Sequence, residues 1–259
     1  MKKHTAFQFS ILSASIFVLC FCISSCHKKN TEASKGTFYF HIHTDIDTNE
    51  VESSTELYRD ASGRQFGLTT AQVYISNVML HNVNGTMYTI PGAVVLKSID
   101  SEEYLIGKAP VGTYDQVMFT VGLDATTNAL QPTAFTNTGY VSNTDMWFGS
   151  TSQGFMFMKL QGMADTSAHQ TGTNLVNFSY EIGSAANLKT VTMLMRTGAL
   201  APYVLTKDGN QFIHMSCDYG ALLSVVNFST QDTTNTYTIN PSLSATIANN
   251  IPNLFQYEE

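Results

Sequence analysis

The 259-residue sequence is poor in cysteine, tryptophan and charged residues. Of its four cysteines, Cys20 and Cys22 lie in an N-terminal segment that we expect to be removed, and Cys26 is expected to carry a lipid, as argued below. Cys217 is then the one remaining thiol, so no intramolecular disulfide can form. The stability of the folded part must therefore come from a hydrophobic core, which a chain of this length can build.

The common catalytic motifs are also missing. No G-x-S-x-G, H-E-x-x-H, P-loop or C-x-x-C pattern occurs, and no two carboxylates can be assigned to the two sides of a glycosidic bond. Cys217 ends an apolar, strand-like segment, where a buried thiol is far more common than a nucleophile. We therefore predict that the protein is not an enzyme.

Positive charge is scarce as well. The chain has 13 lysine and arginine residues against 20 acidic ones, and Lys2 and Lys3 leave with the N-terminal segment. Nucleic-acid binding needs clustered positive charge that neutralises phosphates, so we expect no nucleic-acid partner. The acidic excess favours solubility and attracts cations without selecting one.

Residues 1–25 have the pattern of a bacterial lipoprotein signal. Two lysines precede an uncharged apolar segment, residues 6–22, and ISSC at residues 23–26 gives the order apolar, small, small, cysteine. We expect cleavage before Cys26 and attachment of a diacylglycerol to its thiol, which anchors the protein to a membrane without crossing it. The alternative is an ordinary secretory signal in which Cys26 has no role.

Residues 26–36 are polar and without periodicity. This composition predicts a tether between the lipid and a folded domain at residues 37–259. An acidic cluster after the lipidated cysteine directs some lipoproteins to the cell surface, and none follows Cys26. We therefore expect a cell-envelope location, lipid-anchored to the outer membrane and facing the periplasm rather than the surface.

Short alternating runs of apolar and polar residues, separated by N-G, D-G and P-G turn signals, follow the tether. Residues 154–160 (GFMFMKL) are apolar on both faces of a strand, which predicts a central position in a sheet. Asn240 and Pro241 resemble a helix N-cap and first turn, and apolar residues recur at helical spacing from there to Phe255. We predict one all-β domain, a β-sandwich or Greek-key-like fold, with a short C-terminal helix.

The clearest strand pattern is TFYFHIHTDI at residues 37–46. Alternation places Phe38 and Phe40 on one face and His41 and His43 on the other. Two histidines at i and i+2 on one strand face can begin a metal site, because neutral imidazole is a common ligand. The alternative is a pair of half-exposed histidines on a sheet surface.

The acidic segment at residues 45–56 (DIDTNEVESSTE) places oxygen side chains at positions 1, 3, 5, 9 and 12 of a calcium-loop register. Glu50 stands at position 6, where that loop requires glycine for its sharp turn. A solvated acidic loop is therefore the preferred interpretation, with calcium binding as the alternative.

Methionine is frequent, and thioether sulfur suits Cu(I). Pairs at i and i+2 in an apolar strand are more often core filling, which is how we interpret them here. The prominent residues are Met146, Met156, Met158, Met163, Met193 and Met195.

The order of several segments resembles the MbnP-like family, β-rich secreted or lipid-anchored proteins widespread in Bacteroidetes and related to the methanobactin-operon protein. The resemblance extends from about Phe38 to Met195. Its segments are VYISNVML at residues 73–80, PVGTY at 110–114, MFTVGLD at 118–124, DMW at 145–147 and GFMFMKLQG at 154–162.

This resemblance implies a copper-associated, non-catalytic protein. The family's site combines histidines with a tryptophan that a di-haem enzyme oxidises, so copper and such an enzyme become expected partners. His41 and His43 lie near the family's N-terminal histidine. Trp147 stands one place before the usual tryptophan position, and Glu181 stands where the family commonly has histidine. These four residues form the expected metal site.

The leading hypothesis is thus a membrane-anchored lipoprotein whose MbnP-like domain binds copper without catalysis. The rival hypothesis is a metal-free surface or periplasmic interaction module with a degenerate family site. The loss of the family's residues at Phe148, Ser150 and Glu181 supports the rival. Convergence of His41, His43 and a third donor in a structure distinguishes the two.

Overall fold

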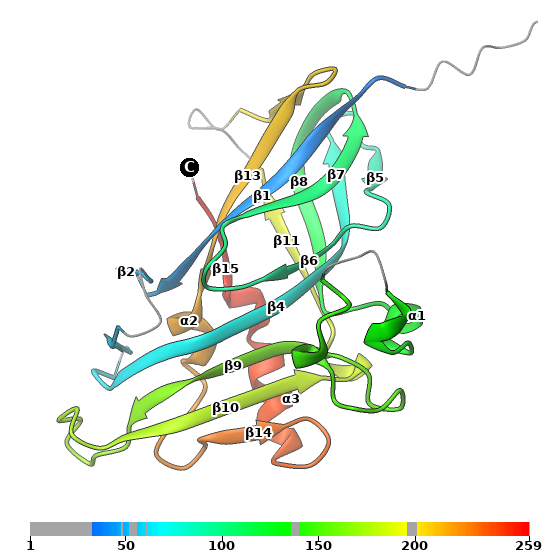
Figure 1. Cartoon of the computed structure of the whole chain (residues 1–259). Coiled ribbons are helices and arrows are strands. Elements are labelled where there is room, and N and C mark those ends of the chain that lie inside the picture. Colours follow the sequence, from blue (N-terminus) through cyan, green and yellow to red (C-terminus); the bar gives the residue numbers. More distant parts are fainter. Residues whose placement is uncertain are drawn as a thin grey trace, which may run out of the picture. The chain divides into compact units, whose positions relative to one another are not determined.

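The computed structural model describes residues 33–258 except 48, 52–55, 61, 136–139 and 196–200. The expected signal segment and Cys26 therefore lie outside the described residues. Among the helices that the structure describes, none combines the length and the apolar character needed to span a membrane. The described chain forms two β-sheets with short helices (Figure 1).

The smaller sheet has five strands and is built around β1 (Lys35–Ile46). β1 pairs in parallel with β13 (Asn210–Asp218) and antiparallel with β7 (Glu103–Pro110) and β2 (Asn49–Glu50). β15 (Phe255–Tyr257) pairs with β13. Because β1 begins at Lys35, the last part of the expected tether belongs to the sheet.

The larger sheet has ten strands, with the main path β11-β8-β4-β9-β10-β14. These are β4 (Gln65–Asn82), β8 (Gly112–Val121), β9 (Met156–Asp165), β10 (Leu175–Gly183), β11 (Lys189–Leu194) and β14 (Thr233–Asn235). The short strands β3 (Tyr58–Arg59), β5 (Met87–Thr89), β6 (Val94–Lys97) and β12 (Tyr203–Leu205) pair with β4 or β8. β9 lies between β4 and β10, which confirms the predicted central strand.

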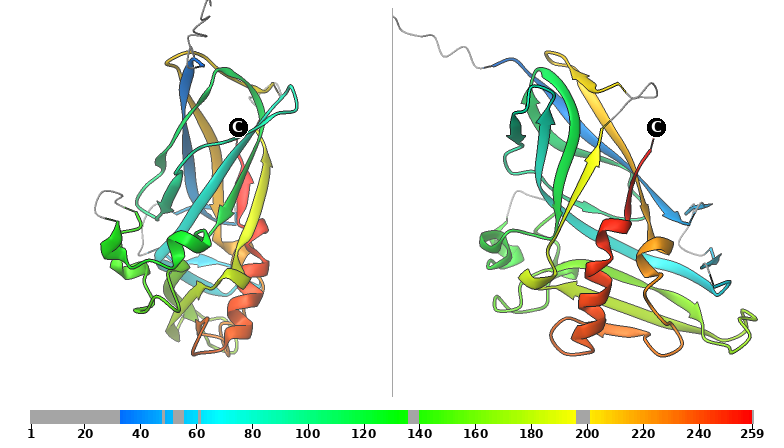
Figure 2. Two further views of the ribbon diagram at one scale, coloured as in Figure 1. Left: turned by 90° about the vertical axis from the view of Figure 1, so that its right-hand side faces the viewer. Right: turned by 180° about the vertical axis from the view of Figure 1, so that it is seen from behind.

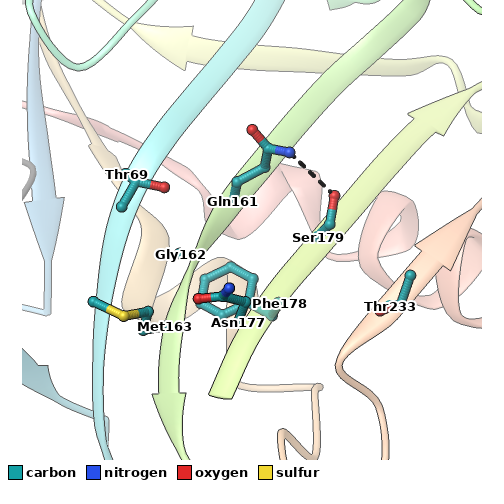
Figure 3. Close-up of a pocket in the computed structure, with 8 residues that line it drawn as sticks. All are labelled: Thr69, Gln161, Gly162, Met163, Asn177, Phe178, Ser179 and Thr233. Carbon is teal, nitrogen blue, oxygen red and sulfur yellow. Dashed lines mark hydrogen bonds between the residues drawn. The ribbon is translucent and has the colours of Figure 1, made fainter. Parts of the chain in front are cut away.

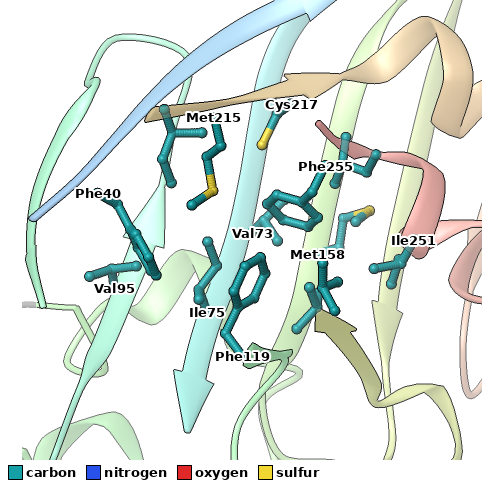
Figure 4. Close-up of a cluster of buried hydrophobic side chains, with 14 of the residues drawn as sticks. Phe40, Val73, Ile75, Val95, Phe119, Met158, Met215, Cys217, Ile251 and Phe255 are labelled. Atoms are coloured by element: carbon teal, nitrogen blue, oxygen red, sulfur yellow. The ribbon is translucent and has the colours of Figure 1, made fainter. Parts of the chain in front are cut away.

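The inner faces of the two sheets share one hydrophobic core (Figure 4). Phe40 of β1, Met215 of β13, Phe119 of β8 and Met158 of β9 are all fully buried in it. Burial of apolar surface contributes about 25 cal/mol per Å², so this core is the main source of stability. The arrangement confirms the predicted all-β, sandwich-like fold.

Short helices pack against a further part of the larger sheet (Figure 2). α2 (Tyr219–Leu223) directly follows β13, and α3 (Pro241–Asn249) contributes Leu243 and Ile247 to the core. The side chain of Asn240 accepts a hydrogen bond from the Leu243 N–H. The predicted N-cap and first-turn proline are therefore confirmed.

The predicted C-terminal helix was too long. Helical spacing continued to Phe255, whereas α3 ends at Asn249, a 3₁₀ turn follows at Ile251–Asn253, and Phe255 lies in β15. Pro252 has no N–H to donate to a carbonyl in the preceding turn, so the α-helical ladder cannot continue through it. The chain instead adds β15 to an edge of β13.

The long connection after β8 covers the outer side of the central strands. It includes α1 (Ala125–Asn128), and its Val141 and Met146 form a second hydrophobic cluster with Tyr74 and Phe155. This cluster explains why the start of β9 is buried on both faces. Of the prominent methionines, Met146, Met156, Met158, Met193 and Met195 are buried, which confirms their core role, whereas Met163 is only partly buried.

Candidate metal centre

β1 presents two histidines on the outer face of the smaller sheet. Phe40 and Ile42 are fully buried, whereas His41 and His43 are half-buried, as the alternation predicted. The centroids of the two imidazole rings are 4.7 Å apart. The strand thus supplies two adjacent nitrogen ligands from a rigid element.

β13 adds a third histidine, which the sequence did not single out as a site residue. The parallel register places His214 directly beside His41, and their Nδ1 atoms are 3.1 Å apart. Ile213 and Met215 point into the core, so the alternation in QFIHMS does place His214 on an outer face. However, the pairing of β13 with β1 brings together residues that are 173 positions apart in the sequence. No local sequence pattern predicts that pairing.

Glu102 supplies a carboxylate beside His41. Its Oε2 lies 3.3 Å from His41 Nε2, and its backbone carbonyl accepts a hydrogen bond of 2.8 Å from the Ile42 N–H. One ligand atom each from His41, His43 and Glu102 lie within 4.8 Å of one another. Among the described residues these three side chains form a group that can hold a metal ion.

A second carboxylate, Glu258, orients His43. Its Oε2 lies 2.8 Å from His43 Nδ1, within ion-pair distance. With Nδ1 protonated, the lone pair of His43 is on Nε2 and is available to a metal. A carboxylate that fixes the tautomer of a ligating histidine in this way is the usual outer-shell arrangement in metal sites.

Lys97 holds the loop that carries Glu102. Its side chain is fully buried, and Nζ donates hydrogen bonds to Thr44 Oγ1 at 2.6 Å and to the carbonyls of Ser98 and Ser101 at 2.5 and 3.1 Å. Burial lowers the pKa of the Lys97 ammonium. Because Thr44 belongs to β1, these contacts tie the loop to the strand that bears the histidines.

The surroundings favour a neutral His214. Burial, followed by the neighbouring His41 and His43, lowers the pKa of its imidazole, and Glu258 only partly opposes this effect. A neutral imidazole has a free lone pair, which metal binding requires. Cys217, by contrast, faces the core, and burial raises its pKa to about 12. Its thiol is buried and protonated, as predicted.

Trp147 and Glu181 do not lie with the histidines. Trp147 packs on Phe155 with ring centroids 4.9 Å apart, in the cluster on the outer side of the larger sheet. Glu181 also faces outward from that sheet, on β10, and its Oε2 accepts a hydrogen bond of 2.6 Å from Asn235 Nδ2. The histidines lie on the opposite outer face of the sandwich, so the structure brings His41 and His43 together without these two residues.

Two other features show no metal-ligand set among the described residues. The described part of the acidic segment is a hairpin in which Asp45 of β1 pairs with Glu50 of β2, not a loop between helices. A groove of about 410 Å³ lies on the outer face of β4, β9 and β10 (Figure 3). Gln161, Asn177 and Ser179 line it with amide and hydroxyl groups, and its lining has no titratable side chain. It therefore offers neither acid–base chemistry nor a strong metal ligand.

Comparison with known proteins adds a relationship over most of this domain. The sequence profile of the family described as MbnP matches residues 35–241. The fold is similar to that of MbnP from Methylosinus trichosporium, with a TM-score of 0.54 and 12% sequence identity over 79% of this chain and 82% of the other. At this identity the structural likeness concerns the fold alone. No curated protein matches the sequence.

Proposed function

The chain belongs to the MbnP family, and we propose that it binds copper without catalysis, through His41, His43 and Glu102. The observation that carries the proposal is the convergence of these three side chains within 4.8 Å on one sheet face. The rival metal-free module required that no third donor join the histidines. Glu102 fills that place, which supports the metal-binding hypothesis.

The donor set agrees with a divalent transition metal. Imidazole nitrogen suits copper, zinc and nickel, whereas carboxylate adds the negative charge that favours a divalent ion. Among first-row divalent ions, sites of this kind bind Cu²⁺ most tightly. The family that this chain resembles is associated with copper, which favours the same ion. Trp147 and Glu181 are not part of the proposed site, since they lie on the other face of the sandwich.

The test is a titration of the purified protein with Cu²⁺, followed by electron paramagnetic resonance and by competition with Zn²⁺. We expect one tightly bound Cu²⁺ with nitrogen ligation in the wild type and loss of that signal in His41→Ala/His43→Ala. His169→Ala is the matched control, because His169 lies in an exposed loop elsewhere. Equal binding by the double variant, or a preference for Zn²⁺, contradicts the proposal, and absence of binding favours the metal-free module.

We further propose that a lipid on Cys26 holds this domain at the outer membrane. The support is the ISSC motif at residues 23–26 and the short distance in sequence between Cys26 and the start of β1 at Lys35. Expression in a bacterium that processes lipoproteins should place the wild type in the membrane fraction and Cys26→Ser in the soluble fraction. Membrane association of Cys26→Ser would contradict lipidation at this residue.

A further inference from the structure

We propose a second metal site, independent of the first, that binds a soft monovalent ion such as Cu(I) or its analogue Ag(I). It is formed by the thioethers of Met79, Met87 and Met118 and the imidazole of His81, with Asp115 as the partner of the histidine. The site lies on the outer face of the larger sheet, on strands β4, β5 and β8. It does not depend on the copper site of the smaller sheet.

The strand register places the four ligands on three neighbouring strands. On one side of β4, Met79 is directly opposite Met118 of β8, and on the other side His81 is directly opposite Met87 of β5. Leu80, between Met79 and His81, is fully buried in the core, so its two neighbours point to the outer face. Within each of these two pairs the Cβ atoms are about 4.5–5.5 Å apart. Met118 and Met87 flank β4 on opposite sides, and their flexible side chains can reach one ion held over Met79 and His81.

These methionines do not serve the core. Met87 is 45% exposed, Met79 and Met118 are half-buried, and none of the three packs against either hydrophobic cluster. The methionines of the core, in contrast, are buried. Packing therefore does not explain why three thioethers are adjacent on this surface.

A β-bulge prepares His81 for metal binding. Gln116 of β8 pairs with His81 and Tyr114 pairs with Asn82, which leaves Asp115 as the extra residue. The bulge turns Asp115 toward the outer face, where its Oδ1 accepts a hydrogen bond of 2.6 Å from His81 Nδ1. The lone pair of His81 is then on Nε2, in the carboxylate–histidine arrangement that is typical of ligating histidines.

The ligand set differs chemically from that of the first site. Three thioethers and an imidazole contribute no negative charge, and the thioethers are soft, which favours Cu(I) or Ag(I) over a divalent ion. The first site has a carboxylate ligand and favours a divalent ion. The two sites can therefore be distinguished by the oxidation state that each prefers.

The experiment is an anaerobic titration with Ag(I) and with Cu(I) of protein labelled with ¹³C at the methionine methyl groups. In the wild type we expect one equivalent to bind and to shift three methionine methyl signals. Met79→Leu/Met118→Leu keeps side-chain volume, so the fold should survive, which circular dichroism checks. Its affinity should fall at least about 100-fold, since loss of a mere outer-shell partner already costs up to this much.

Two controls make the outcome decisive. Met163→Leu removes a partly exposed methionine elsewhere on the same sheet and should bind Ag(I) like the wild type. The Ag(I) titration is repeated with the His41→Ala/His43→Ala variant. Ag(I) binding should be unchanged, because the second site does not use these histidines, and this result does not depend on whether the first site binds copper. Wild-type affinity in Met79→Leu/Met118→Leu, or loss of Ag(I) binding in the histidine background, overturns the proposal.

Discussion

His41 and His214 lie directly beside each other on parallel strands, with their Nδ1 atoms 3.1 Å apart. Two imidazole nitrogens at this distance either share one proton or face one ion. His41 faces Glu102 through its other nitrogen, Nε2. With copper held by Nε2 and Glu102, the Nδ1 pair therefore shares one proton, and His214 fixes the orientation of His41.

This relationship predicts that His214 strengthens copper binding. His214→Gln should weaken Cu²⁺ affinity about 10- to 100-fold, because the site loses the hydrogen-bond partner of His41. A competition titration against a chelator of known affinity measures the change. His169→Ala again serves as the control, and wild-type affinity in His214→Gln would show that His214 is only a neighbour of the site.

Glu258 provides a prediction about an outer-shell residue. Glu258→Gln keeps the shape of the side chain but removes the charge that lies 2.8 Å from His43 Nδ1. We expect Cu²⁺ affinity to fall about 10-fold or more, while the electron paramagnetic resonance spectrum keeps the nitrogen pattern of the wild type. Unchanged affinity would contradict the orienting role, and weaker binding with a changed spectrum would mean that Glu258 is itself a ligand.

The sequence predicted the parts of the site that depend on local pattern. Alternation placed His41 and His43 on one face, and that prediction is confirmed. The prediction did not include Glu102, His214 or Glu258. These residues are distant from β1 in the sequence, and only the folded arrangement of the chain brings them beside it. No periodicity within a single strand carries that information.

The same limit applies to the fold. The sandwich and the central strand followed from residues 154–160 and from alternating runs, which are local features. The end of α3 did not, because the apolar spacing up to Phe255 fits a helix and a strand that caps a sheet edge almost equally well. The free edge of β13 and the missing N–H of Pro252 decide between them.

Lys97 is predicted to position Glu102 as well as to stabilise the fold. Lys97→Met keeps much of the side-chain volume but leaves two carbonyls and Thr44 Oγ1 without their donor. Each buried unsatisfied group costs about 1–3 kcal/mol, partly offset because a buried charge is removed. We expect a net loss of about 2 kcal/mol in the free energy of unfolding, measured by urea denaturation.

A positioning role also requires weaker copper binding by Lys97→Met at temperatures where the variant is fully folded. Lys189→Met is the control, because the hydrogen bond that Lys189 donates to Asn249 is exposed to solvent. Its stability should change by less than about 0.5 kcal/mol. If Lys97→Met were less stable but bound Cu²⁺ like the wild type, Lys97 would support the fold alone.

Asp165 at the end of β9 predicts a pH-dependent contribution to stability. Burial alone would raise its pKa, but its carboxylate accepts hydrogen bonds from the N–H groups of Gly172 and Ser167 and from Ser167 Oγ, at 2.8–2.9 Å, which hold the pKa at about 2. The pKa in the unfolded chain is about 3.9. The ionised carboxylate therefore stabilises the folded state fully above the unfolded pKa, and this stabilisation is lost as the pH falls toward 2.

Asp165→Asn is the variant that isolates this effect. It should lower the melting temperature at pH 7, where the wild-type carboxylate is ionised and accepts all three hydrogen bonds. The difference between variant and wild type should shrink between pH 4 and pH 2, as the wild-type carboxyl becomes protonated. Thermal unfolding followed by circular dichroism from pH 7 to pH 2 measures it, with Asp208→Asn in an exposed turn as the control. A difference that stays constant across this range would mean that the lost contacts do not depend on the charge of Asp165.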